Sequence, residues 1–327
     1  MIKKRTLKDD GFSIARWRFA LVGLLLCALV CLLVFHLASL QVLPNKDEGF
    51  EFLQRQGNAR TLRVEPLSAS RGVITDRNGE PLAVSTPVVS LWANPIELTA
   101  DSVDVAPLAK ALGVSEASLR AKLLRSKNKE FIYLKRHQAP QLAEQILAQN
   151  WAGVYGRAEY KRFYPAGEVA AHVVGFTDVD DLGQEGLELA FDGWLSGLPG
   201  ERQVLKDLKG RVVKDMGLLQ APEAGKDLRL SIDLRMQYLA YRELKQAVSK
   251  HGAKGGSIVL LDARTGEVLA MANQPAYNPN ERSRLKVASL RNRAIIDQFE
   301  PGSTMKPLTV MAAMETGRYH PRTLIDT

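Results

Sequence analysis

A serine followed three residues later by a lysine is the arrangement in this sequence that could do covalent chemistry. Ser303 and Lys306 lie within residues 299–307, ahead of the apolar run 308–314. On a helix, side chains at i and i+3 share one face, roughly 5–6 Å apart at their β-carbons, so the amine can reach the hydroxyl proton. The partial positive charge of a helix N-terminus favours a serine alkoxide and disfavours a protonated lysine beside it. The pair therefore predicts an activated serine nucleophile.

The same spacing occurs twice more, so spacing alone does not select the nucleophile. Ser126 with Lys129, and Ser283 with Lys286, lie in strongly charged stretches where a lysine is expected to stay solvated and protonated. The third motif follows a Pro-Gly pair and precedes a segment apolar enough to be buried, and burial lowers the pKa of a lysine. Pro307 disfavours helical geometry at the residue before it, but a first helical turn tolerates proline. A serine that only caps a core helix is the structural alternative.

An apolar segment near the N-terminus is long enough to cross a membrane. Residues 19–43 contain no Lys, Arg, Asp or Glu, and about 20 apolar residues span a bilayer core. Basic residues outnumber acidic ones before it, which the positive-inside tendency associates with a cytoplasmic N-terminus. We therefore expect residues 1–18 to be a cytoplasmic tail and residues 19–43 a transmembrane helix. A cleaved signal peptide is the alternative, but the segment is longer than a usual signal core and no Ala-x-Ala site closes it.

Composition argues against several kinds of site. Both cysteines, Cys27 and Cys31, lie in the apolar segment, so we expect no disulfide and no cysteine-based metal site in the exported part. The five histidines show no pair at metal-ligand spacing, and we interpret them as structural. The net charge of +8 is not gathered in a basic, aromatic-interleaved stripe, so nucleic acid is not an expected partner.

The exported chain has room for more than one core. With 327 residues, 46% of them hydrophobic and 24% charged, two domains plus an anchor are expected. The first is an α+β domain over residues 44–225, in which Asn78-Gly79 predicts a hairpin turn. Residues 106–124 and 140–147 have helical spacing of their apolar side chains. Nothing in this domain suggests chemistry of its own.

The second domain is expected over residues 226–327. Asp233 can cap a helix whose apolar residues step by three and four positions. The apolar stretches 257–262 and 267–272 predict two strands joined by a turn, and their nearly unbroken apolar character predicts burial on both faces with helices on each side. This order of elements is expected to place Ser303 at the edge of a central sheet.

Short motifs spread over nearly the whole chain resemble those of the class B penicillin-binding proteins, the membrane-anchored peptidoglycan D,D-transpeptidases. Tyr-Asn-Pro-Asn at 277–280, together with Phe-Glu-Pro-Gly-Ser at 299–303, is similar to the septal, FtsI-like branch. Besides the apolar anchor, the resemblance rests on residues 71–79, 162–167 with His172, Gly175 and Phe176, 183–188, Ile232-Asp233 with Gln237, 262–266, 277–280, and 291–294 leading into 299–307.

The resemblance implies an α+β fold with three parts. These are a single N-terminal transmembrane helix, an elongated α+β pedestal (dimerisation-like) domain over residues 44–225, and the first part of a penicillin-binding transpeptidase domain over residues 226–327. The last part would contain an antiparallel sheet flanked by helices. Ser303 would be the nucleophile that the D-Ala-D-Ala stem peptide acylates, with Lys306 as its general base and the Ser303 backbone N–H as half of an oxyanion hole.

The resemblance also implies partners and a location. The substrates would be peptidoglycan stem peptides, and β-lactams would acylate the same serine. Division membrane proteins, including a polytopic glycan polymerase, would be partners in septum synthesis. The protein would be a single-pass protein of the cell inner membrane with a cytoplasmic N-terminus and a periplasmic bulk, and it would use no cofactor and no metal.

Two motifs of the family do not follow Lys306. Ser-x-Asn and Lys-Thr-Gly are expected downstream of the nucleophile. Ser126-Lys127-Asn128 and Arg264-Thr265-Gly266 imitate them but precede the serine, so we accept neither as a match. We therefore expect a truncated chain that ends at Thr327 without them and that has no efficient transpeptidase activity by itself. Robust penicillin labelling at Ser303 would contradict this expectation.

Two other functions remain compatible with the sequence. A β-lactam hydrolase or sensor also uses Ser-x-x-Lys, and the lifetime of the acyl-enzyme would separate it from a transpeptidase. A non-enzymatic membrane-anchored division scaffold would act through residues 44–225 and the span. Its cellular role would survive the substitution Ser303→Ala.

Overall fold

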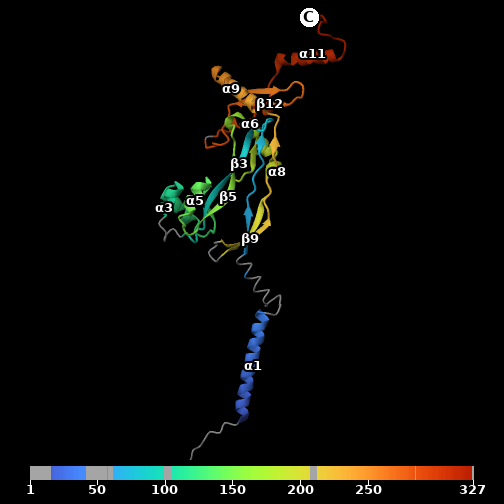
Figure 1. Ribbon diagram of the computed structural model, residues 1–327. Helices are drawn as coiled ribbons and strands as arrows, with labels where there is room; N and C mark the ends of the chain where they lie inside the picture. The colour runs from blue at the N-terminus through green and yellow to red at the C-terminus, as the bar shows by residue number, and fades with distance from the viewer. Residues whose placement is uncertain are drawn as a thin grey trace, which may run out of the picture. The chain divides into compact units, whose positions relative to one another are not determined.

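The computed structural model describes residues 16–41, 57, 62–98, 105–206, 212–283 and 285–325. The chain divides into two compact units, Met1–Pro66 with Glu201–Gln220, and Leu67–Gly200 with Ala221–Thr327. Most of the expected cytoplasmic tail (residues 1–15), the end of the expected span (42–43) and Thr327 lie outside the described residues. Figure 1 shows the elements in chain order.

Among the described residues, one helix is long and apolar enough to cross a membrane. This is α1 (Arg16–Gln41), in which the 22 residues Trp17–Ala38 have a mean hydropathy of 2.8. No described side chain of that segment is buried, and apolar residues cover all sides of the helix. A helix that is apolar all round is typical of a membrane span. The predicted N-terminal apolar helix is therefore confirmed.

The first unit also contains a three-stranded sheet in the order β1-β8-β9. Its strands are β1 (Leu62–Leu67), β8 (Gly200–Lys206) and β9 (Val212–Gln220). The Glu65 carboxylate on β1 forms ion pairs with Arg202 and Lys206 on β8, both at 2.9 Å. Val204 at the centre of β8 is fully buried, whereas every residue of β9 is exposed.

The second unit is built around a five-stranded sheet in which the long strand β3 is central. β5 pairs with β3 in antiparallel register from Val84↔Phe163 to Ala93↔Val154, and β4 pairs with the other side of β3. Figure 1 shows β3 and β5 running together with α3 and α5 beside them. The strands are β2 (Ile74–Thr75), β3 (Pro81–Ala93), β4 (Ile132–Gln138), β5 (Val154–Phe163) and β10 (Leu228–Arg229).

Three helices cover one face of this sheet. They are α3 (Ala106–Leu112), α4 (Glu116–Arg125) and α5 (Pro140–Leu147). Their apolar side chains form one buried cluster with Leu91 and Ala93 of β3. The helical stretch predicted over 106–124 forms two helices rather than one, because the chain adopts φ = +66° at Gly113 and Ser115 caps a new helix. The predicted helix 140–147 and the Asn78-Gly79 turn between β2 and β3 are confirmed.

Short elements join the sheet to the C-terminal part of the same unit. They are η1 (Gly167–Val169), α6 (Ala171–Val174), β6 (Phe176–Thr177), β7 (Gly183–Glu185), α7 (Gly186–Ala190) and α8 (Asp192–Leu195). They surround a second apolar cluster that includes Ile74, Leu82, Tyr164 and Tyr277. A Cβ at Gly175 would lie 1.7 Å from the Glu185 carbonyl oxygen, so two backbone segments meet there at a distance that only glycine permits.

The C-terminal part combines one long helix with a two-stranded sheet. Asp233 accepts a hydrogen bond from the Arg235 backbone N–H at 3.0 Å and caps α9, as predicted. β11 and β12 pair in antiparallel fashion from Gly256↔Gln274 onward. The elements are α9 (Leu234–Lys250), β11 (Gly256–Leu261), β12 (Val268–Gln274), η2 (Val287–Ser289), α10 (Arg293–Ile296), η3 (Gly302–Met305) and α11 (Lys306–Glu315).

The predicted burial on both faces is wrong for β11, whereas no residue of β12 is exposed. Tyr241 and Leu244 of α9 bury Ala272 on one face. Val259 and Leu261 of β11 remain 43% and 54% exposed. The apolar side chains of β11 predict that the strand is buried, but no described element covers Val259 and Leu261.

Candidate active site

The predicted nucleophile lies in a 3₁₀ turn that leads directly into a helix. Ser303 belongs to η3, and Lys306 is the first residue of α11. Gly302 adopts φ = +55°, a conformation that only glycine takes without strain, so the Pro-Gly pair sets the direction from which the turn begins. The structure thus places Ser303 and Lys306 one turn apart on a helical segment, as their spacing predicts.

The same turn provides a hydrogen bond that replaces the one lost at Pro307. Proline has no N–H, so it cannot bond the Ser303 carbonyl four residues back. The Lys306 backbone N–H donates to that carbonyl instead, which is the tighter 3₁₀ pattern. Lys306 keeps helical angles, φ = −58° and ψ = −41°, despite the proline that follows it. The Ser303 carbonyl oxygen is therefore hydrogen-bonded, although the i to i+4 pattern of an α-helix could not supply its donor.

The burial expected around the lysine is not found in the described chain. Ser303 and Lys306 are both exposed, and no hydrogen bond joins the Ser303 hydroxyl to the Lys306 amine in the described residues. Every residue of α11 is exposed except Ala313, and Figure 1 shows this helix apart from β12. The apolar side chains of 308–314 face solvent because no described element packs on them. The predicted position of Ser303 at a sheet edge is likewise not seen.

Exposure does not separate the three Ser-x-x-Lys motifs, but their backbones do. Ser126 is the C-cap residue directly after α4, so it lies at the negative end of that helix dipole, and Lys129 is exposed. Ser283 and Lys286 are exposed and precede η2 outside any helix, with residue 284 between them undescribed. Of the three motifs, the one at Ser303 and Lys306 opens a helix, where a partial positive charge favours an alkoxide.

A buried asparagine holds the segment that leads into the nucleophile turn. Asn273, at the end of β12, is 1% exposed. Its amide donates to the Asn292 side-chain oxygen at 2.9 Å. Its own oxygen accepts from the Ala294 backbone N–H at 2.9 Å and the Ser257 hydroxyl at 2.7 Å. Sequence reasoning missed Asn273, because one polar residue at a strand end carries no signal of its own.

Asn292 and His172 extend this network to α6. The Asn292 amide donates to the His172 backbone carbonyl at 3.3 Å, and the His172 Nε2 lies 2.9 Å from the Ser289 carbonyl oxygen. Burial lowers the pKa of His172, which favours its neutral form. The neutral ring packs edge-on against Tyr277 at 5.3 Å between centroids. The histidine is therefore structural, as predicted.

A buried ionic network connects three of the short sequence motifs in the second unit. Glu188 is fully buried and accepts one hydrogen bond from Arg71 at 2.6 Å and one from Arg162 at 2.7 Å. Arg71 also donates to Asp192 at 2.8 Å. Burial opposes the charge of Arg71, but Glu188 and Asp192 outweigh it and raise the pKa of Arg71. The opposite charges of these groups compensate one another, so the network stabilises the domain rather than offering a reactive group.

The described residues contain no group of three or more His, Cys, Asp or Glu side chains that could hold a metal ion. The candidate site therefore consists of Ser303, Lys306 and the backbone of their turn.

Two family models match the chain. The model for the penicillin-binding protein dimerisation domain matches residues 66–230, and that for the penicillin binding protein transpeptidase domain matches residues 256–327. The second match contains Ser303 and Lys306.

Curated relatives show the same similarity over most of the chain. A peptidoglycan D,D-transpeptidase FtsI of Escherichia coli is 45% identical over 99% of this chain and 55% of its own length. A probable peptidoglycan D,D-transpeptidase PbpC of Pseudomonas aeruginosa is 46% identical over 88% of this chain and 51% of its own length. The chain spans about half the length of the curated relatives it matches.

Solved structures agree in fold. Penicillin Binding Protein 2X from Streptococcus thermophilus superposes with a TM-score of 0.58 at 25% identity, over 80% of this chain and 43% of that one. A peptidoglycan synthetase from Bifidobacterium adolescentis gives a TM-score of 0.53 at 24% identity, over 79% of this chain and 52% of that one.

Proposed function

This chain belongs to the penicillin-binding proteins that combine a dimerisation domain with a transpeptidase domain, and from this premise we propose that it serves peptidoglycan D,D-transpeptidation at the division septum through Ser303. The observation that carries the proposal is the 3₁₀ turn that places Ser303 and Lys306 at the start of α11, inside the stretch similar to transpeptidase domains. The names of the curated relatives support the reaction class.

The proposed reaction is acyl transfer in two steps. The Ser303 hydroxyl oxygen attacks the carbonyl carbon between the two terminal D-alanines of a stem peptide, and the Lys306 amine accepts the hydroxyl proton. The C–N bond breaks, and the terminal D-alanine leaves with that proton on its nitrogen. The amine of a second stem peptide then attacks the ester carbon and forms a new amide bond. The bond to the Ser303 oxygen breaks, and a proton from the attacking amine passes to that oxygen, which regenerates the hydroxyl.

The turn itself contributes to the proposed first step. The tetrahedral intermediate carries a negative oxygen, and backbone N–H groups at a helix start stabilise such a charge. The Ser303 N–H would supply one donor. An exposed amine is solvated by water, so Lys306 must be desolvated when the stem peptide covers the turn if it is to act as a base.

The proposed location is the cell inner membrane, with α1 as the single span, the N-terminus in the cytoplasm and the folded units in the periplasm. The excess of Lys and Arg before residue 19 supports this orientation. Peptidoglycan stem peptides and β-lactams are the proposed ligands of Ser303. Division membrane proteins, including a polytopic glycan polymerase, are the proposed partners.

Penicillin labelling tests the proposed nucleophile. The protein, with its anchor in detergent micelles, is treated with fluorescent penicillin and digested, and the labelled peptide is sequenced by mass spectrometry. In keeping with the low activity expected of this chain, we expect slow labelling that is confined to Ser303 and is lost in Ser303→Ala. In Lys306→Met we expect it to be slower by a further 10²-fold or more, since a positioned base contributes about 10²–10⁴.

The other two Ser-x-x-Lys motifs supply matched controls. Ser126→Ala and Lys286→Met are expected to label like the unmodified protein. Label on Ser126 or Ser283, or full labelling in Ser303→Ala, would overturn the assignment. The lifetime of the adduct separates the alternatives, because a hydrolase releases the opened β-lactam rapidly whereas a transpeptidase retains it.

A further inference from the structure

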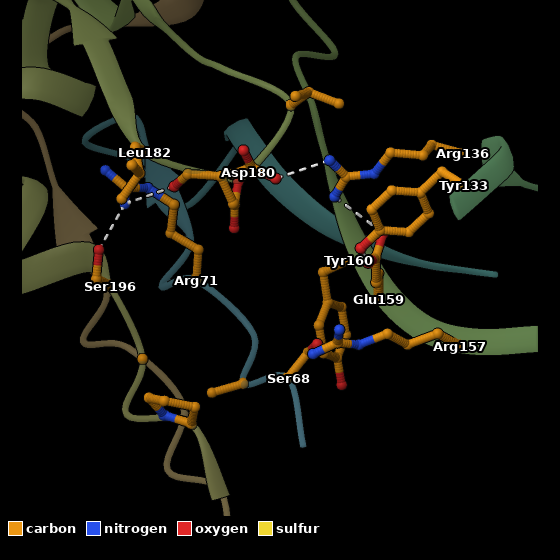
Figure 2. A pocket seen from close by; sticks show the side chains of 15 residues that line it. Ser68, Arg71, Tyr133, Arg136, Arg157, Glu159, Tyr160, Asp180, Leu182 and Ser196 are labelled. Atoms are coloured by element: carbon orange, nitrogen blue, oxygen red, sulfur yellow. Dashed lines mark hydrogen bonds and ion pairs between the residues drawn. The ribbon is translucent and has the colours of Figure 1, made fainter. Parts of the chain in front are cut away.

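The face of the five-stranded sheet that α3, α4 and α5 leave uncovered carries a cavity of about 480 Å³. Pockets of roughly 300–1,000 Å³ accommodate small ligands. β4 and β5 form its wall, and the segments around Ser68, Asp180 and Ser196 form its rim. We name it the β5 cavity, and neither Ser303 nor Lys306 lines it. Figure 2 shows its side chains.

Strand alternation explains why this face is polar. Leu91 and Ala93 point to the helical cluster, so Ser90 and its neighbours in register point to the opposite face. Ser90 pairs directly with Arg157 of β5, and Glu159 lies two residues further along the same strand. Arg157 and Glu159 therefore belong to the face that carries the cavity.

Most charges in the wall are already paired. The buried carboxylate of Glu159 accepts hydrogen bonds from Ser90, from the Tyr133 hydroxyl at 2.8 Å and from Arg136 at 3.2 Å. The Arg136 guanidinium also donates to Asp180 at 2.7 Å and lies 4.4 Å from the centre of the Tyr133 ring. Arg136 is therefore fixed between two carboxylates and an aromatic ring, which makes this side of the cavity rigid.

Arg157 and Asp180 are two groups of opposite charge that remain able to bind a ligand, and Asp181 in the same lining has a buried Oδ1 without a hydrogen-bond partner among the described residues. Arg157 is half-buried and has no hydrogen-bond or ion-pair partner among the residues that the structure describes. Asp180 uses its Oδ1 for Arg136, and its other carboxylate oxygen has no partner in the same described part. Figure 2 shows Asp180 in the upper part of the cavity and Arg157 in the lower part, with Glu159 and Tyr160 between them in this view.

We propose that the β5 cavity binds a zwitterionic peptide end of dipeptide size, with its carboxylate on Arg157 and its ammonium on Asp180. A guanidinium accepts a carboxylate in a two-pronged hydrogen-bonded pair, which makes arginine suited to this role. A dipeptide spans about 7 Å when extended, which fits a cavity of this volume. This site goes beyond the acyl-transfer turn, because it requires no nucleophile.

Blocked dipeptides test each charge separately. The protein in detergent micelles is titrated calorimetrically with L-alanyl-L-alanine, its N-acetyl form, which lacks the ammonium, and its C-terminal amide, which lacks the carboxylate. We expect the free dipeptide to bind with a Kd below about 10 mM, and each blocked form to bind at least tenfold more weakly. The L configuration keeps this measurement separate from the chemistry proposed for Ser303.

Two variants assign the charges to residues. Arg157→Gln is expected to weaken the free dipeptide about tenfold without further weakening the amide. Asp180→Asn, which keeps an oxygen for Arg136, is expected to weaken the free dipeptide similarly without further weakening the N-acetyl form. Arg264→Gln, on the exposed turn after β11, is the matched control and should bind as the unmodified protein does.

Equal binding of the three peptides, no saturation up to the stated concentration, or unchanged affinity in both variants would overturn the proposal. The unfolding midpoint of each variant is measured alongside. Because Arg157 has no described partner, Arg157→Gln should unfold within experimental error of the control. The blocked peptides test the unmodified protein, so the outcome does not depend on the folding of any variant.

Discussion

At the scale of single residues, the nucleophile turn depends on one glycine. Gly302 precedes Ser303 with φ = +55°, and Gly317 adopts φ = +70° at the other end of α11. Neither position has any atom within 4 Å of where a Cβ would lie. A substitution to alanine therefore adds backbone strain of about 1–2 kcal/mol at either site without a steric clash.

This pair gives a matched test of the turn geometry. We expect Gly302→Ala to slow penicillin labelling of Ser303, because relief of the strain turns the Ser303 backbone away from its position at the helix start. Gly317→Ala carries the same strain but should label at the unmodified rate. Equal slowing in both variants would show that helix stability, rather than the turn, controls the reaction.

The buried network gives a prediction on stability. Glu188→Gln removes the negative charge between Arg71 and Arg162, and two buried guanidinium groups are left with less compensation. Removing one partner of a buried ion pair costs about 3–5 kcal/mol. Glu243→Gln, on the surface of α9 with 52% of its side chain exposed, should cost less than about 1 kcal/mol. Urea unfolding of the two variants measures this difference, and equal values would refute the role given to Glu188.

Asp181 gives a prediction on pH dependence. Burial raises the pKa of Asp181 to about 6, although Arg162 and Arg71 act in the opposite direction. A carboxylic acid whose pKa is raised on folding binds its proton more tightly in the folded state, so its contribution to stability falls as the pH rises from about 4 to 6. Asp181→Asn keeps a side chain that tolerates the φ of +65° at this position.

We therefore expect Asp181→Asn to raise the free energy of unfolding at pH 8, by up to about 2–3 kcal/mol. At pH 4 the substitution should have little effect, because the unmodified side chain is then largely neutral in the fold. Urea unfolding at the two pH values measures the difference. A gain of equal size at both would show that the effect is not due to ionisation.

At the scale of elements, the start of α9 couples the hairpin between β2 and β3 to the C-terminal part of the second unit. Asp233 caps the helix and also accepts from the Asn78 amide at 3.2 Å. Asp76, which is 1% exposed, accepts from the Asn78 and Leu234 backbone N–H groups at 2.7 and 3.1 Å. Two carboxylates thus occupy the positive end of one helix dipole.

Removal of the cap should destabilise α9 and the hairpin together. We expect Asp233→Ala to lower the free energy of unfolding by about 1–2 kcal/mol, whereas Asp233→Asn, which keeps an acceptor, should lose less. Hydrogen exchange then shows which segments open. Faster exchange confined to α9, with the Asn78 turn unchanged, would contradict the coupling.

At the scale of the whole molecule, α1 is the element expected to hold the chain in a membrane. Trp17–Ala38 is apolar on all sides, so in water it would expose about 22 residues of hydrophobic surface. We expect the protein to remain in the membrane fraction after an alkaline carbonate wash, and a form without residues 1–41 to be released. Release of the intact protein by the wash would contradict a spanning helix.

Much of this protein follows from its sequence, because local patterns act through short-range physics. Apolar length predicts α1, the Asn78-Gly79 pair predicts a turn, and Asp233 predicts a helix start. The spacing of Ser303 and Lys306 predicts that both lie on one helical segment. Their catalytic roles and the domain boundary near residue 225 stay predictions.

Features that depend on contacts between residues far apart in the sequence are determined only by the tertiary structure. It divides the helical stretch predicted over 106–124 at Gly113, and it leaves β11 and α11 exposed among the described residues. It also brings Glu188 between Arg71 and Arg162, which lie 117 and 26 residues away along the chain. The Asn273 network and the β5 cavity arise in the same way. Burial and charge pairing depend on which surfaces meet, whereas a residue pattern records only the preference of each segment for an apolar or polar neighbour.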